Sequence, residues 1–256
     1  MNNPQLPDFF RNSNTSRAIR VVLMRAVLFG FVFFAACPLS LHCQNVPPSN
    51  AILVRPRSYV GDEITSSDAF KKVLGKPPTD KSELSKDQDG VENAVKNAPE
   101  GGTERNQAMR EEKHFAADSF NGEFGPWFKM DALPATSRLL QNAFDDTWTI
   151  GHEAKRVHLR ARPDGTTNTS SYPSVHAMEA TVLCGILKML QPDRAAELDK
   201  HCEEIGYHRL ILRKHFPSDL VAGHRVGKCI LKQMIQSPAF KVDFANALQE
   251  LRPYLK

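Results

Sequence analysis

Apolar residues recur at helical spacing through the second half of the chain, and alternating strand-like patterns are scarce. Residues 104–119 are rich in helix-forming residues. Between Pro134 and about Arg160 the spacing predicts one or two helices, whose apolar face collects Leu139, Leu140, Ala143, Phe144 and Trp148. Residues 163–172 are dense in Gly, Thr, Asn and Ser, which predicts a loop.

Prolines and glycines divide the rest of this half into separate helices. Val175–Leu190 is a strongly apolar helical segment, and Pro192 begins a helix that we expect to end at Gly206. Prolines also begin the last two helices, over residues 218–236 and from 238 to near 253, because proline is tolerated in a first turn. The pattern predicts an all-α protein with a single helical-bundle domain over residues 104–256.

Residues 44–103 lack this regular apolar pattern. Pro47, Pro48 and Pro56 favour extended backbone, and residues 76–103 are polar and charged with several helix breakers. We predict an extended or flexible lead-in, with short helical pieces as an alternative.

The first 43 residues are typical of an export signal. Arg17, Arg20 and Arg25 are basic, and Ala26–Ala36 is an apolar run of 11 residues. Such a run is shorter than the roughly 20 residues that cross a bilayer. We therefore expect residues 1–43 to be a cleaved signal peptide, and the mature protein to be periplasmic or secreted.

The cleavage position is open from the sequence. Small residues precede Cys37, which makes Cys37 a candidate for a lipid anchor, while cleavage near Cys43 is the alternative. A further alternative retains Val21–Cys43 as an uncleaved membrane anchor.

The charge of the chain argues against general nucleic-acid binding. The chain has 33 basic and 29 acidic residues, and residues 1–43 contain four of the former and one of the latter. The mature chain is thus close to neutral, with 29 basic and 28 acidic residues.

Three cysteines follow residue 43, at positions Cys184, Cys202 and Cys229. They form no CxxC pair, so a structural zinc site is not expected. An oxidising compartment permits one disulfide and leaves one thiol. We favour buried free thiols, because an unpaired cysteine behaves as a small apolar residue.

Arg209, His215 and Asp219 form one candidate chemical cluster. His215 and Asp219 are four apart, so a helical turn would place them on one face. A carboxylate that accepts from one imidazole nitrogen leaves the other nitrogen free to attack. Alone, however, the spacing favours an ordinary helix N-terminus with an acid in its first turn.

A second cluster is Pro173-Ser174-Val175-His176, directly before the apolar helix. Ser174 is a suitable N-cap, and free N–H groups at a helix start bind phosphate oxygens. His176 could then protonate a leaving oxygen. Alone, a simple cap with a solvated histidine is the better interpretation.

A third cluster contains Lys155 and Arg162. They are seven apart, so a continuous helix would place both on one face, two turns apart, where they could hold one anion. Alone, a solvated basic face is the better interpretation.

Together and in this order, Lys-x6-Arg-Pro, Pro-Ser-x-His and Arg-x5-His-x3-Asp resemble the signature of the phosphatidic-acid-phosphatase type 2 superfamily. More narrowly, the chain resembles the class A bacterial non-specific acid phosphatases. The resemblance extends to Phe124–Phe128, Leu133-Pro134 and Ser218–Gly223, and covers about residues 104–240. It implies the helical bundle of the phosphatidic-acid-phosphatase and vanadium haloperoxidase type.

The resemblance implies hydrolysis of phosphate monoesters through a phosphohistidine. His215 would attack phosphorus, Asp219 would orient His215, and His176 would act as general acid and base. The substrate phosphate would be bound by Lys155, Arg162, Ser174, Val175 and Arg209. The resemblance implies no metal and no cofactor, and small phosphorylated molecules as the binding partners.

Three positions depart from the family pattern. Val175 stands where the family has glycine, and it costs about 1–3 kcal/mol if that position requires a positive φ. His208 stands where the family has serine before the arginine, and could reshape the pocket. Ala177 stands where this class often has threonine.

Other functions stay open at this point. A non-catalytic oxyanion-binding or envelope-anchored pseudoenzyme is the main alternative, and a lipid phosphatase or a vanadate-dependent haloperoxidase ranks below it. The sequence leaves the physiological substrate, the disulfide state and a homo-oligomer undecided.

Overall fold

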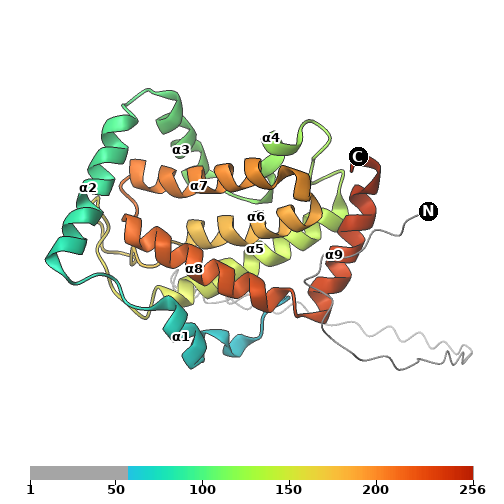
Figure 1. Cartoon of the computed structure of the whole chain (residues 1–256), viewed down its shortest axis with the longest axis horizontal. Helices are drawn as coiled ribbons and strands as arrows, with labels where there is room; N and C mark the ends of the chain where they lie inside the picture. The colour runs from blue at the N-terminus through green and yellow to red at the C-terminus, as the bar shows by residue number, and fades with distance from the viewer. Residues whose placement is uncertain (1–56, 256) are drawn as a thin grey trace, which may run out of the picture. The chain divides into compact units, whose positions relative to one another are not determined.

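The computed structural model describes residues 57–255, and these residues pack as a bundle of helices (Figure 1). The helices are α1 Asp68–Leu74, α2 Lys81–Asn97, α3 Thr103–Lys113, α4 Asn121–Phe124, α5 Pro134–Ala154, α6 Val175–Leu190, α7 Ala195–Ile211, α8 Pro217–Met234 and α9 Pro238–Leu251. The 3₁₀ segments are η2 Asp62–Ser66, η3 Ala117–Phe120, η4 Pro192–Arg194 and η5 Arg252–Tyr254. The predicted all-α fold is confirmed, and no strand occurs among the described residues.

Helix α6 is the centre of the bundle. It packs against α5, α7 and α8, and Figure 1 shows it running between α7 and α8. The helix begins where Ser174 caps it, because the Ser174 Oγ accepts the Ala177 N–H at 3.3 Å. Its side chains are buried on nearly every face, which explains why its sequence is apolar without a polar stripe.

The contact between α6 and α8 is unusually close because α8 presents glycine to it. A Cβ on Gly223 would lie 2.5 Å from the carbonyl oxygen of Ser174, and one on Gly227 would lie 2.9 Å from that of Met178. The backbones can therefore approach each other only without these side chains. This approach brings the start of α8 beside the start of α6, and so brings the cluster of His215 and Asp219 beside the Pro173–His176 cluster.

A side chain from α9, near the C-terminal end of the chain, binds the start of α5. The Glu250 carboxylate on α9 accepts the N–H groups of Ala135 and Thr136 at 2.9 and 2.8 Å, and the Thr136 hydroxyl at 2.7 Å. These are N–H groups that a helix start leaves unpaired. The contact fixes α9 against α5.

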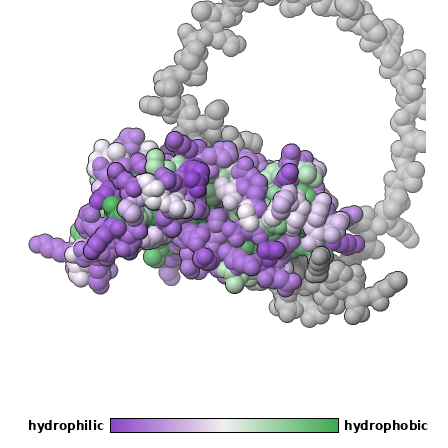
Figure 2. Space-filling model, turned by 90° about the horizontal axis from the view of Figure 1, so that it is seen from above, coloured by the Kyte–Doolittle hydropathy of each residue, from purple (hydrophilic) through white to green (hydrophobic). Residues whose placement is uncertain are grey.

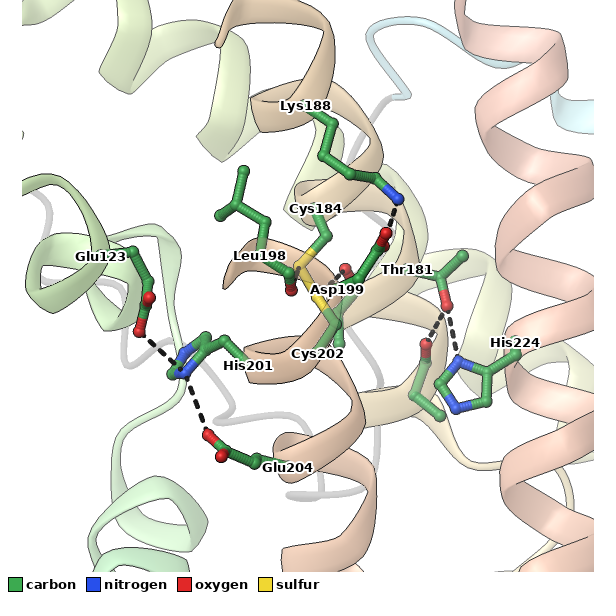
Figure 3. Close-up of a disulfide and its surroundings, with 12 residues drawn as sticks. Glu123, Thr181, Cys184, Lys188, Leu198, Asp199, His201, Cys202, Glu204 and His224 are labelled. Carbon is green, nitrogen blue, oxygen red and sulfur yellow. Dashed lines mark hydrogen bonds and ion pairs between the residues drawn. A yellow bond between two sulfur atoms is a disulfide. The ribbon is translucent and has the colours of Figure 1, made fainter. Parts of the chain in front are cut away.

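A disulfide joins α6 to α7, between Cys184 and Cys202 (Figure 3). Our expectation of buried free thiols is therefore wrong for this pair, whereas Cys229 is free. The Cα atoms lie 6.6 Å apart because the two helices pack side by side, which is a distance that a disulfide spans. Figure 3 also shows the Lys188–Asp199 ion pair between the same two helices.

The structure differs from the predicted extended lead-in over residues 57–103, most of which form α1 and α2. Asp80 caps α2 by accepting the Ser82 N–H at 2.8 Å. A narrow buried stripe of Asp87, Val91 and Ala94 is sufficient to pack α2 against α7 and α8. Because most residues of α2 are polar, the sequence pattern did not reveal this buried stripe. Residues 44–56, and the predicted signal peptide over 1–43, lie outside the described residues.

Helix α7 also continues past the predicted end at Gly206. A Cβ on Gly206 would meet only ordinary contacts, the nearest being His224 Nε2 at 3.6 Å, so glycine here lies inside a regular helix. The helix ends instead before Arg213, whose φ of +54° is the left-handed conformation that terminates helices.

The surface is mainly polar. Figure 2 shows a face on which hydrophilic side chains dominate and hydrophobic ones are scattered. In the part of the chain that the structure describes, no helix combines the length and apolarity needed to cross a membrane.

We predict opposite effects of two glycine-to-alanine changes. Gly223→Ala should lower the free energy of unfolding by about 1–3 kcal/mol, because the new Cβ overlaps the Ser174 carbonyl. The control, Gly206→Ala, should be neutral or stabilise the protein by up to about 1 kcal/mol, because alanine favours helix and space is available. Urea denaturation of both variants measures the difference. Equal effects would contradict the close helix contact.

Candidate active site

A cavity of about 380 Å³ opens at the end of the bundle where α5 and α7 finish and α6 begins. Six of the residues predicted from the sequence line it: Lys155, Arg162, Val175, His176, Arg209 and His215. Asp219 and Ser174 are fully buried beside it. The fold therefore brings the three separate clusters to one place.

Lys155 is buried at the C-cap of α5. Its Nζ donates to the carbonyl oxygens of Ser170 at 2.7 Å and Pro173 at 2.9 Å. Burial, together with the nearby Arg162 charge, lowers the pKa of Lys155 to about 7. The ammonium thus ties the end of α5 to the loop that leads into α6.

Arg162 reaches the cavity from that loop, so the predicted common helical face with Lys155 is wrong. Helix α5 ends at Ala154, and the chain from there to residue 174 is a loop. The Arg162 guanidinium donates to the Lys214 carbonyl at 2.8 Å and to the Thr169 hydroxyl at 2.9 Å. Loop geometry therefore brings the two cations together.

Arg209 enters the cavity from the last turn of α7 and is only 4% exposed. Its guanidinium forms an ion pair with Glu112 of α3, which also lines the cavity. The buried Nε has no hydrogen-bond partner among residues 57–255. A buried donor of this kind is available to an anion.

Val175 is compatible with the site, although the family pattern has glycine there. Arg213 is the sole non-glycine residue with positive φ in the described part of the chain, so Val175 carries no such strain. Space for its side chain comes from Gly151 of α5, where a Cβ would lie 2.8 Å from a Val175 methyl group. As the first residue of α6, Val175 has an N–H that the helix itself leaves unpaired.

His215 lies in the turn between α7 and α8 and is 2% exposed. Its Nδ1 is 3.7 Å from Asp219 Oδ2, which is close for an ion pair but too long for a hydrogen bond. Asp219 instead accepts the Phe216 N–H at 2.8 Å and pairs with Arg160 at 2.7 Å. The predicted dyad is thus adjacent without being directly hydrogen-bonded.

Arg160 is the residue whose position sequence reasoning missed. Besides Asp219, its guanidinium binds Asp87 of α2 at 2.7 Å and the Ser218 hydroxyl at 2.8 Å. The Phe216 ring lies 4.1 Å from the guanidinium carbon. Arg160 therefore links α2, the loop before α6 and the first turn of α8. In the sequence, Arg160 is one of several basic residues near Arg162, and no motif distinguishes it from them.

His176 extends into the cavity from the first turn of α6 and stacks on Phe115, with ring centroids 5.4 Å apart. Burial and the Arg209 charge hold the pKa of His176 well below 6.5. Burial and the Lys155 charge do the same to the pKa of His215. Both imidazoles are therefore neutral at neutral pH until an anion offsets the surrounding positive charge.

His208 does not line the cavity, which corrects its prediction as a pocket residue. Its Nδ1 lies 2.6 Å from Glu111, and its Nε2 lies 3.4 Å from Glu104, both on α3. Burial alone would lower the pKa of His208, but the bond to Glu111 and the Glu104 charge raise it overall. His208 fastens α3 to α7 and so supports Glu112 at the cavity.

Glu179 is a second residue that sequence reasoning missed. It lines the cavity and is 2% exposed. Its signal is a single acid in the otherwise apolar helix α6. Within residues 57–255, no group of three or more His, Cys, Asp or Glu is arranged to hold a metal ion.

Comparison with known proteins points to one superfamily. Residues 144–243, which include Lys155, Arg209 and Asp219, match the family model described as the PAP2 superfamily. The chain is 32% identical over 133 residues to a non-specific acid phosphatase of Salmonella typhi, covering 46% of this chain and 53% of that protein. Identity is 33% over 112 residues to the Salmonella typhimurium protein of that name, covering 38% and 45%. In both alignments the chain spans about half the length of the relative.

The chain also aligns, over a longer range, with a non-specific acid phosphatase of Providencia stuartii. It covers 227 residues at 24% identity, which is 80% of this chain and 89% of that protein.

We predict that Asp87→Ala lowers the free energy of unfolding by about 1–3 kcal/mol, because the Arg160 guanidinium, whose side chain is 10% exposed, loses one of its two carboxylate partners. Asp89→Ala is the control: this residue lies on the same helix but is exposed, so the change should stay within about 0.5 kcal/mol. Urea denaturation provides both values. A small effect of Asp87→Ala would show that α2 is dispensable to the frame of the site.

Proposed function

We propose that this chain, whose residues 144–243 match the PAP2 superfamily model, hydrolyses phosphate monoesters through a covalent phosphohistidine on His215. The observation that carries the proposal is the convergence of Lys155, Arg162 and Arg209 with the imidazoles of His176 and His215 on one cavity. The similar Salmonella and Providencia proteins are named non-specific acid phosphatases, which supports the same activity.

Binding of the phosphoryl group relies on fixed positive charge. A phosphate monoester carries close to two negative charges near neutral pH. In this proposal, Lys155, Arg162 and Arg209 contact its oxygens, and the N–H groups at the start of α6 add donors. Ser174 holds that helix start in place through its cap. The same groups would stabilise charge that develops in the transition state.

The first chemical step forms a nitrogen–phosphorus bond. A neutral His215 nitrogen attacks phosphorus while the bond to the leaving oxygen breaks, and His176 gives that oxygen its proton. The low pKa of His215 supports this role, because the attacking nitrogen must be unprotonated. The substrate's negative charge would raise the pKa of His176 again, and so load the acid only when substrate is bound.

The second step returns the enzyme to its starting state. Water attacks the phosphohistidine, and neutral His176 takes its proton. The nitrogen–phosphorus bond breaks, and inorganic phosphate leaves. Asp219 acts as a positioning residue throughout, since it fixes the first turn of α8 and with it His215. In this scheme the positive charge comes from side chains, and no metal ion takes part.

We also propose that the protein works in the periplasm or outside the cell. The Cys184–Cys202 disulfide supports an oxidising compartment. The export signal, the lipid anchor at Cys37 and a homo-oligomer remain predictions, the first two because they fall on residues outside the described part.

The test of the mechanism is labelling in the presence of a chelator, quenched with an alkaline denaturant, because the nitrogen–phosphorus bond of phosphohistidine survives base and is hydrolysed in acid. Wild-type protein incubated with a phosphomonoester labelled on its phosphoryl group should retain covalent label that a later acid treatment removes, and His215→Ala should retain none and lose turnover. The control is His114→Ala, which changes an exposed histidine with a side chain 75% exposed and should behave as wild type.

Two outcomes would overturn this mechanism. Loss of wild-type turnover in the presence of the chelator would mean that the reaction requires a metal ion. A folded wild type that binds phosphate but neither turns over nor carries label would instead indicate an oxyanion-binding protein.

We further predict that Glu112→Gln lowers KM for a small phosphomonoester about 2- to 5-fold. Glu112 pairs with Arg209 at the cavity, so its carboxylate competes with the phosphoryl group for that cation. Steady-state kinetics and inhibition by inorganic phosphate measure the effect. Glu100→Gln removes an exposed acid between α2 and α3 and serves as the control. A raised KM would mean that Glu112 orients Arg209 instead of competing.

A further inference from the structure

We propose that Glu179 acts as a neutral hydrogen-bond donor to the bound phosphoryl group, and that its ionisation closes the cavity to dianions as pH rises. The proposal rests on the proposed phosphatase function and adds a specificity-determining group to it. None of the three sequence clusters includes this residue.

The position of Glu179 on α6 directs it toward the reacting groups. It follows His176 by three residues, so both side chains lie on one face of the helix. Helical side chains lean toward the N-terminus of their helix, and here that end forms the cavity wall. The Glu179 side chain therefore covers the turn that carries Val175 and His176.

Among the described residues, Glu179 has no hydrogen-bond or ion-pair partner that would explain its burial. It is 2% exposed, and its Oε1 has no hydrogen bond in the described structure. It forms no ion pair within residues 57–255, in contrast to Glu112, which pairs with Arg209. A buried polar group without a partner is costly, and this one lines a cavity that suits an anion.

Burial favours the protonated carboxyl. It raises the pKa of Glu179 well above 4.5, although the Arg209 and Lys155 charges act in the opposite direction. Below its folded-state pKa the group is neutral and can donate its proton in a hydrogen bond to a phosphoryl oxygen. Above that pKa it loses the donor and adds a negative charge beside the bound dianion. Affinity for the dianion should therefore fall as pH rises.

Other titratable and charged groups face the same cavity, and their charges also affect the binding of an anion. From neighbouring helices these are Glu112 of α3, His152 and Lys155 of α5, and Arg209 of α7. The loop and the turn contribute Arg162, Lys214 and His215, next to His176 of α6 itself. Asp219 of α8 is engaged by Arg160. All of these remain in a Glu179 variant, so the ratio of variant to wild type reports Glu179 together with its effect on the pKa of Lys155.

Two variants separate charge from hydrogen bonding. Glu179→Gln keeps the shape and a donor but cannot ionise, and Glu179→Met removes both. The probe is sulfate, a tetrahedral dianion whose charge stays constant between pH 5 and 9, with binding measured by calorimetry. Above the Glu179 pKa, the sulfate affinity of wild type should fall with rising pH more steeply than that of Glu179→Gln. The difference should reach up to about tenfold for each pH unit. At pH 5, Glu179→Met should bind sulfate about 10- to 100-fold more weakly than Glu179→Gln.

Turnover and stability give independent readouts. The alkaline limb of kcat/KM should move to higher pH in Glu179→Gln, whereas Glu112→Gln should keep the wild-type pH dependence. Because the pKa of Glu179 is raised in the folded state, its contribution to stability is fully present below its unfolded-state pKa and is lost as pH rises through its folded-state pKa. Glu179→Gln cannot ionise, so its free energy of unfolding should rise relative to that of wild type from pH 5 to 8.

The inference is overturned if wild type and Glu179→Gln share one pH dependence of sulfate binding. It is also overturned if Glu179→Met binds sulfate as tightly as Glu179→Gln at pH 5. Failure of the phosphatase function looks different, since it removes turnover and label from wild type while leaving sulfate binding measurable.

Discussion

The arrangement of the site depends on holding several positive charges at one cavity, against both their loss of hydration and their mutual repulsion. The pKa of Lys155 is lowered to about 7, first by burial and then by the neighbouring Arg162 charge, and both effects carry a free-energy cost. The scaffold offsets it with carbonyl oxygens around Lys155 and Arg162, and with Glu112 beside Arg209. These partners orient each cation but leave the cavity net positive. A bound dianion would therefore relieve a strain that the fold maintains in its absence.

Such a cavity also requires a stiff frame, and Arg160 provides much of it. It draws Asp87, Ser218 and Asp219 together, so the first turn of α8 cannot move independently of α2. Because His215 directly precedes α8, its position follows from this network rather than from a hydrogen bond of its own to Asp219. The Cys184–Cys202 disulfide fixes α6 to α7 farther along the same helices.

The sequence predicted the fold where apolar residues are dense, and failed where few residues do the packing. Val175–Leu190 was predicted to the residue, since a cap, an apolar run and a following proline agree. Helix α2 was missed because its buried stripe is narrow and includes Asp87, a polar residue whose buried carboxylate is paired with Arg160 and Ser218. The site residues were found through motif spacing. Their connections were not, because Arg160 binds a carboxylate 73 positions away.

Two residues in the first two turns of α6, Val175 and Glu179, shape the cavity of this chain. Val175 fits because Gly151 on α5 leaves room for it, so the substitution changes the cavity wall without straining the backbone. Glu179, one turn later, places a carboxyl beside these cations, and burial raises its pKa well above 4.5. In the proposed scheme the cations attract the dianion, while ionisation of Glu179 would add a negative charge beside it. Binding would therefore weaken as pH rises, which would couple phosphate recognition to the acidity of the compartment in which the protein works.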